Sequence, residues 1–159
     1  MSAPYRIRNP THAVTEVLPS EPPAALASAV TRPPGRFSAG VYFAAAEMLA
    51  LEGHVKPALR AAERGMRLET PDPEAQALYA WLLYRCDRST TAQVSAAVWS
   101  QIDRALARDS SCALAHYFKS VLLQRAGQVG EARWHLQRGR ELDPNQSAAD
   151  RALALLDDE

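Results

Sequence analysis

From residue 38 onward, apolar and polar positions follow the 3.6-residue period of amphipathic helices. Segment 91–109 shows the pattern well. Its apolar residues recur on one helical face: Val94, Ala97, Val98, Ile102, Ala105 and Leu106. Gly and Pro residues separate most of the segments. The pattern predicts helices within 38–53, 55–69, 73–86, 91–109, 112–127, 130–143 and 147–158, with no strand. The expected fold class is therefore all-α.

The N-terminal region has a different composition, since seven of the eleven prolines fall within residues 1–36. Each proline removes a backbone donor and restricts the residue before it, so long helices are excluded there. We expect a largely irregular, Pro-rich arm at 1–37 and a helical domain at 38–159. Two interpretations of the arm stay open. It is a spacer or leader, or it docks on a partner or on the protein's own groove, with self-association of two chains as one form of docking.

Small and turn-forming residues recur along the helical domain at a spacing of about 34 residues. The spacing divides the domain into units 39–72, 73–112 and 113–146. A closing helix follows at about 147–157. Six extra residues in the second unit fit between residues 86 and 94. Small residues let paired helices approach closely, glycines allow tight turns, and proline stops a helix. The positions that carry this pattern are Ala46, Gly53, Ala58, Gly65, Ala80, Ala105, Ser120, Gly127, Ala132, Gly139 and Pro144.

Two stretches, "EGHVKPALRAAERGMRLE" and "RAGQVGEARWHLQRGRELDPN", make this spacing resemble the tetratricopeptide repeat. The resemblance implies three helix-turn-helix units stacked in a right-handed superhelix, with the first helix of each unit lining a concave groove. A closing helix would cover the end of the stack. We expect it to turn Ala149, Ala152, Leu153 and Leu156 inward and Asp150, Arg151 and Asp157 outward. Lys119 departs from the pattern, because the family has an apolar core residue at that position.

The resemblance places a set of first-helix residues in the groove: Gly40, Phe43, Ala44, Glu47, Ala50, Leu51, Glu74, Ala77, Leu78, Trp81, Tyr84, Arg85, Leu114, Tyr117, Phe118, Val121, Gln124 and Arg125. Aromatic residues and arginine supply much of the energy at protein interfaces. The candidate partner-binding residues are Phe43, Glu47, Leu78, Trp81, Tyr84, Arg85, Tyr117, Val121 and Arg125. Alternatively, several of these aromatics fill the core against their own second helix. The groove positions of the first two units are not basic, which argues against the carboxylate ligands that some family members grip.

No catalytic, cofactor or metal pattern stands out. The four histidines lack metal-ligand spacing, and His116 is interpreted as a partly buried packing residue. No phosphate-binding loop or nucleophile motif is present. Formal net charge is zero, so nucleic acid is not an expected partner. Cys86 and Cys112 are expected to be reduced thiols packed at helix ends, with a disulfide between them as the alternative. We find neither an apolar secretory signal nor a membrane-spanning stretch, and therefore expect a cytoplasmic protein with no membrane association.

These observations lead to a non-catalytic adaptor as the main hypothesis, with a partner peptide or helix bound in the apolar, aromatic groove. One alternative is a dedicated bacterial chaperone for a secreted or multi-domain client, because the layout resembles that of small bacterial secretion chaperones in its length, its three repeats and its N-terminal arm. Separately, Arg outnumbers Lys sixteen to two, which hints at a GC-rich bacterial genome. Another is the helical tail of a larger regulatory protein. An enzyme is the least favoured class.

Overall fold

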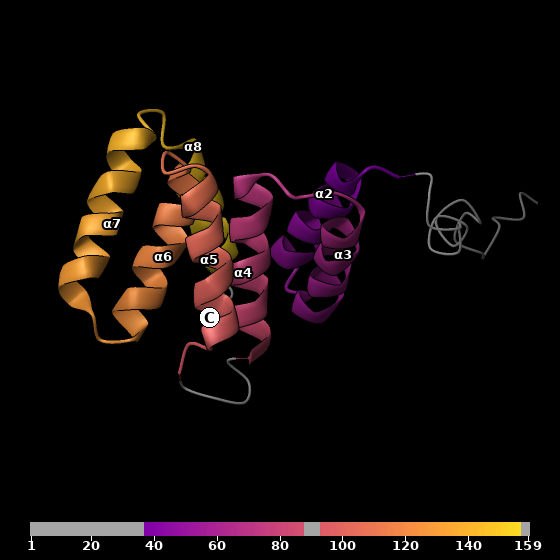
Figure 1. Cartoon of the computed structure of the whole chain (residues 1–159), viewed down its shortest axis with the longest axis horizontal. Helices are drawn as coiled ribbons and strands as arrows, with labels where there is room; N and C mark the ends of the chain where they lie inside the picture. Colours follow the sequence, from indigo (N-terminus) through magenta and orange to yellow (C-terminus); the bar gives the residue numbers. More distant parts are fainter. Residues whose placement is uncertain (1–36, 88–92, 157–159) are drawn as a thin grey trace, which may run out of the picture. The chain divides into compact units, whose positions relative to one another are not determined.

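The computed structural model describes residues 37–87 and 93–156, so the expected arm lies outside the described residues apart from Phe37. The described residues form seven helices and no strand, which confirms the all-α expectation for them (Figure 1). The helices are α2 (Ala39–Leu51), α3 (Val55–Leu68), α4 (Pro73–Asp87), α5 (Ala96–Arg108), α6 (Ala113–Arg125), α7 (Val129–Leu142) and α8 (Ser147–Leu156). Each lies within one of the predicted segments, apart from one residue at two helix boundaries.

The helices pack in sequential pairs. α2 packs on α3, α4 on α5 and α6 on α7, while α3–α4 and α5–α6 contacts join neighbouring pairs. Gly53 and Gly127 take up the positive φ angles, 78° and 79°, that the turns within the first and third pairs require. Ala46 and Ala58, which the repeat pattern places opposite each other, are both fully buried. The predicted pairing of small residues within the first unit is therefore consistent with the packing.

Two buried glycines make room for aromatic rings. A Cβ atom added to Gly65 of α3 would lie 2.8 Å from Cε2 of Phe43 in α2. A Cβ atom on Gly139 of α7 would lie 2.9 Å from Cε1 of Tyr117 in α6. These four residues occupy the same two repeat positions in the first and third units. In both units, the ring that requires the glycine comes from the first helix of the same unit.

In the second unit, the residues at these two repeat positions both have small side chains. Its residues at these two positions are Ala77 and Ala105, and both are fully buried. Because no ring projects from Ala77, a Cβ atom is accommodated at residue 105. In every unit, therefore, at least one of the two positions carries a very small residue where the first and second helix meet.

The end of α7 and the start of α8 are fixed by Asp143 and Pro144. Proline cannot continue a helix, and α7 ends at Leu142 as predicted. The buried Asp143 carboxylate accepts hydrogen bonds from the backbone N–H groups of Ser147 (3.0 Å) and Ala149 (3.0 Å). These contacts satisfy donors of the first turn of α8 that have no partner within the helix. The helix therefore begins at a defined place directly after the third pair.

α8 packs on the first helices of the pairs. It contacts α6 and reaches α2, and its side chains and backbone also bond to α4. The inward residues differ from the prediction. Leu153 is 54% exposed, whereas Leu155 is only 1% exposed. The prediction that Leu153 faces inward is wrong, because the face that α8 buries is centred on Ala148, Ala152 and Leu155.

Candidate functional site

The surface formed by α2, α4 and α6, here called the first-helix face, carries the residues that were expected to bind a partner. Among these, Phe43, Leu78, Trp81, Tyr84 and Tyr117 are buried. Glu47, Arg85 and Val121 are half-buried, and Arg125 is exposed. The wider predicted set divides in the same way: Ala50, Ala77, Leu114 and Phe118 are buried, whereas Gly40, Ala44, Leu51, Glu74 and Gln124 are exposed.

Phe43 and Tyr117 pack against the second helix of their own unit, whereas Trp81, Tyr84 and Phe118 form a cluster between neighbouring first helices. The rings of Trp81 in α4 and Phe118 in α6 stack with centroids 5.1 Å apart and planes 3° apart. The ring of Tyr84, also in α4, lies beside that of Trp81, and the two ring centroids are 5.3 Å apart. Offset stacking of this kind stabilises the contact beyond the burial of apolar area. The cluster therefore joins α4 to α6. We call these three rings, Trp81, Tyr84 and Phe118, the aromatic floor of the first-helix face.

α8 lies on this floor, and its last turn is held by hydrogen bonds. Trp81 Nε1–H donates to the Leu155 carbonyl oxygen at 3.3 Å, and Arg85 Nη1 donates to the same oxygen at 3.2 Å. The last four carbonyl groups of a helix have no partner within the helix, and a nearby cation is favourable there. Two residues predicted to bind a partner therefore bind a helix end supplied by the chain itself.

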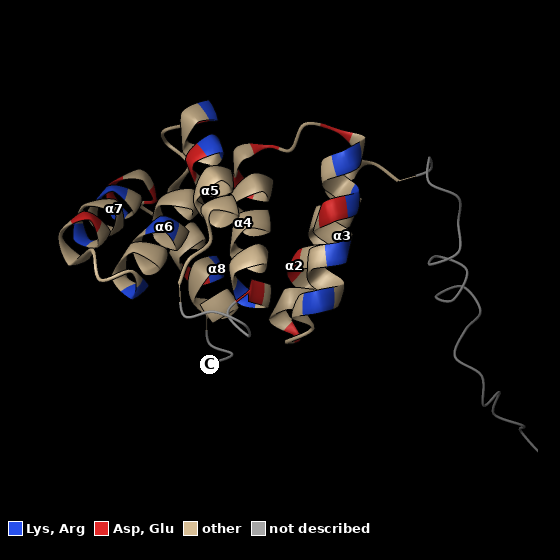
Figure 2. Cartoon of the chain, turned by 60° about the horizontal axis from the view of Figure 1, so that its bottom comes forward, with Lys and Arg blue, Asp and Glu red and all other residues tan. Residues whose placement is uncertain are grey.

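Arg151 holds the middle of α8 to two carboxylates of the first-helix face. Its Nε and Nη2 donate to the two oxygens of Glu47 in α2 at 2.8 and 3.1 Å, and its Nη1 donates to Glu74 of α4 at 2.6 Å. The hydrogen bond with Glu47 is the main reason that the pKa of Arg151 is raised. Figure 2 shows oppositely charged residues side by side where α8 meets α4. The planar guanidinium matches the carboxylate fork, so these contacts fix the register of α8.

The prediction that Arg151 points outward is wrong for the same reason. The sequence allows two helical faces of equal spacing, one with Ala148, Arg151, Ala152 and Leu155 and the other with Ala149, Ala152, Leu153 and Leu156. Sequence reasoning treated the charged residue as solvent-facing, although a half-buried arginine can lie at the edge of an apolar contact when carboxylates are close.

A pair of buried histidines was also missed. His116 Nδ1 of α6 lies 2.8 Å from His135 Nδ1 of α7, and His116 Nε2 lies 3.0 Å from the Ser110 carbonyl oxygen. A carbonyl oxygen only accepts, so neutral His116 carries its proton on Nε2 and His135 donates from Nδ1. Burial is the main cause that lowers both pKa values, that of His135 to about 4. The interpretation of His116 as a packing residue agrees with this arrangement.

Other chemistry on the described part of the chain is sparse. Within residues 37–87 and 93–156, no group of three or more His, Cys, Asp or Glu residues is arranged to hold a metal ion. Cys86 and Cys112 are both thiols and form no disulfide, and burial raises the pKa of each. A raised thiol pKa lowers the thiolate fraction and hence the reactivity. None of the described helices has the length and apolarity needed to cross a membrane.

Lys119, which departs from the repeat pattern, is accommodated by an ion pair. Its Nζ donates to Asp103 of α5 at 2.7 Å, while the side chain itself is 20% exposed. The apolar stem therefore lies in the α5–α6 contact and the ammonium reaches its partner at the surface.

Comparison of the chain with protein-family models, with curated proteins and with solved structures found no match.

Proposed function

We propose that this protein is a non-catalytic protein-interaction module of the tetratricopeptide type, whose first-helix face binds an amphipathic helix of a partner protein. The observation that carries the proposal is α8, which lies on this face as a helical ligand would. The face supplies an aromatic floor, two donors for a helix end and two carboxylates for a basic side chain. These are the kinds of contact that helix-binding surfaces offer, and they support the proposal.

The repeat assignment within this proposal draws support from the packing. The Phe43–Gly65 and Tyr117–Gly139 contacts occur at equivalent positions of the first and third units. If the repeat in the sequence were accidental, there would be no reason for an aromatic ring to contact a glycine at equivalent positions of both units. The pairwise order of α2 to α7 is also that of stacked helix-turn-helix units.

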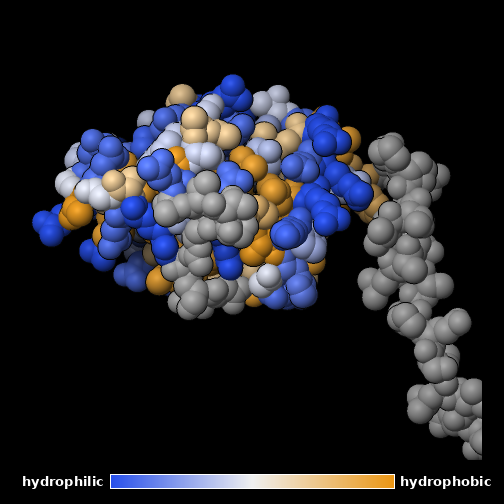
Figure 3. Space-filling model, turned by 90° about the horizontal axis from the view of Figure 1, so that it is seen from below, coloured by the Kyte–Doolittle hydropathy of each residue, from blue (hydrophilic) through white to orange (hydrophobic). Residues whose placement is uncertain are grey.

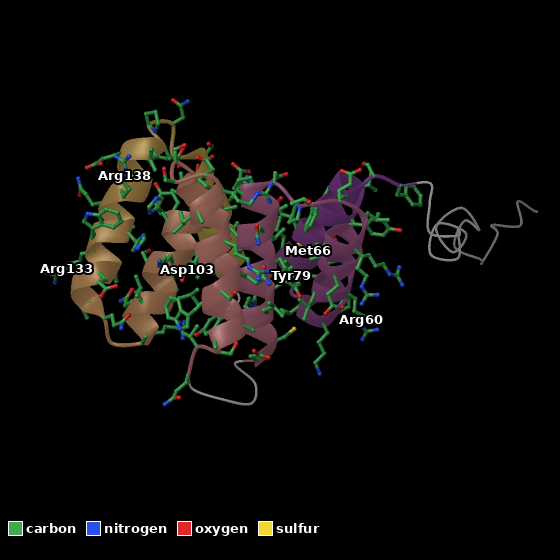
Figure 4. All side chains as sticks on the ribbon, viewed as in Figure 1. Arg60, Met66, Tyr79, Asp103, Arg133 and Arg138 are labelled. Atoms are coloured by element: carbon green, nitrogen blue, oxygen red, sulfur yellow. The ribbon has the colours of Figure 1, made fainter. Side chains whose placement is uncertain are left out.

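The proposal is tested by photo-crosslinking from the first-helix face in cells of the source organism. A crosslinking residue replaces Val121, which is half-buried on α6, and a matched control replaces Arg133, which is exposed on α7. Figure 4 shows Arg133 at the outer edge of α7. We expect Val121 to yield a crosslinked partner, with the attachment mapped by mass spectrometry to an amphipathic segment. Crosslinks from Arg133 alone would place the binding surface elsewhere and contradict the proposal.

A second control separates specific capture from general hydrophobic adhesion. The described surface exposes other large apolar side chains, among them Met48 and Trp134, the latter 60% exposed. Figure 3 shows such hydrophobic groups distributed over one face of the molecule among polar ones. A crosslinker at Trp134 should not yield the partner that Val121 yields. An identical set of captured proteins from both positions would indicate non-specific adhesion instead of a site.

A further inference from the structure

We propose that α8 is an internal ligand that the partner helix replaces, and that its contacts define the chemistry of that helix. This inference rests on the proposed function and specifies it. The recognised pattern is a small residue, then an arginine and a small residue three and four positions later, then a leucine in the last turn. In α8 these are Ala148, Arg151, Ala152 and Leu155.

The first requirement is the arginine. Glu47 and Glu74 come from different first helices and converge on one guanidinium through three hydrogen bonds of 2.6 to 3.1 Å. Without α8, two carboxylates of like charge would face the same space. A lysine ammonium is a point charge and cannot match both oxygens of Glu47 while reaching Glu74. The first-helix face therefore prefers a helix with arginine at this position.

The second requirement is a helix that ends near the leucine. The Leu155 carbonyl accepts hydrogen bonds from both Trp81 and Arg85. In the interior of a helix that oxygen would also accept from the N–H group four residues later, and its two lone pairs could not serve that donor together with both side chains. Trp81 is 1% exposed, so its indole N–H needs a partner that the last turn of a helix supplies.

The third requirement is a narrow apolar face. Only Ala148, Ala152 and Leu155 of α8 are buried, and two of them are alanines. A bulky side chain at either alanine position would lift the helix away from the aromatic floor. The same feature explains why α8 can be replaced, because Leu155 is the only large side chain that it buries.

The test uses the full chain and a labelled, amidated peptide with the sequence of residues 147–156. Asp150 and Ala154 are exposed and one turn apart, so a lysine in place of Ala154 allows a lactam bridge that stabilises the helix on its outer side. Binding is measured by fluorescence anisotropy. Wild-type protein presents the face only in the fraction of molecules with α8 displaced, which weakens the apparent affinity by that fraction. We expect Arg151→Ala, which loosens α8, to bind the peptide at least about tenfold more tightly than wild type.

A charge reversal tests the arginine requirement directly. Against the Arg151→Ala protein, a peptide with glutamate in place of its arginine should bind at least about tenfold more weakly. A protein with Glu47→Arg and Glu74→Arg should show the opposite preference. Arg133→Ala, on the exposed surface of α7, is the matched control and should bind the peptide as wild type does. Circular dichroism confirms that each variant is folded.

Two results would overturn the inference. One is equal peptide affinity for wild type and Arg151→Ala, and the other is the same peptide preference before and after charge reversal. Either result would leave the proposed function standing if Val121 still crosslinks a partner helix. If the peptide behaves as expected but Val121 captures nothing, α8 is a displaceable segment and the proposed function fails.

Discussion

Replacing Gly65 or Gly139 by alanine should destabilise the protein, even though alanine is the better helix former. In a helix interior, alanine is favoured over glycine by up to about 1 kcal/mol. At these positions, however, the new Cβ atom would approach the ring of Phe43 to 2.8 Å or that of Tyr117 to 2.9 Å. Both rings are buried and come from the facing helix, so they cannot swing into solvent. Overpacking of this kind costs about 1–3 kcal/mol, which leaves a net loss of up to about 2 kcal/mol.

The chain offers its own control in Gly130, which lies in α7 and has no atom within 4 Å of an added Cβ. Gly130→Ala should be neutral or stabilising by up to about 1 kcal/mol. Gly130 is the second residue of α7, so alanine gains no more there than at an interior position, and the difference between Gly130→Ala and Gly65→Ala gives a lower bound on the steric cost. Urea unfolding followed by circular dichroism measures the free energy of unfolding of each variant.

A double-mutant cycle then assigns the cost to the ring. Phe43→Leu removes the atoms that the added Cβ would meet, so Gly65→Ala should cost at least about 1 kcal/mol less in that background. The reasoning is refuted if Gly65→Ala is as stable as Gly130→Ala. It is also refuted if the cost of Gly65→Ala is unchanged by Phe43→Leu. Because the same contact recurs in the third unit, Gly139→Ala should behave as Gly65→Ala does.

Two predictions concern titratable groups. Burial lowers the pKa of both His116 and His135, so below about pH 6.5 the unfolded chain binds protons at these residues more readily than the folded chain, and the free energy of unfolding should fall as pH falls. For His135, whose pKa is lowered to about 4, the fall extends to about pH 4 and amounts to up to about 3 kcal/mol. Urea unfolding of a His135→Phe variant should show a shallower pH dependence over this range than wild type, and an equal slope would contradict the assignment. Iodoacetamide at neutral pH should alkylate Cys86 before Cys112, because Cys112 is more buried. Peptide mapping identifies the modified sites. Faster modification of Cys112 in the folded protein would contradict this order and show that α6 opens locally.

The helices themselves were largely predictable, because they depend on local periodicity and on residues that stop helices. The pattern at 55–69 yields α3 at Val55–Leu68, and Pro144 marks the end of α7. Small residues at a regular spacing also predicted which positions would be buried where two helices meet. These features follow from short-range rules: 3.6 residues per turn, the missing N–H of proline and the missing side chain of glycine.

The position of α8 was decided only by the tertiary structure. The stretch "RALALL" is apolar on more than one side, so its sequence does not choose between Leu153 and Leu155 as the buried residue. The choice is made by partners that are distant in sequence: Arg151 meets Glu47 104 residues away, and Leu155 meets Trp81 74 residues away. The histidine pair has the same origin, since it forms only when α6 and α7 are packed together. Contacts of this kind leave no period in the sequence, because they depend on where whole helices lie in space.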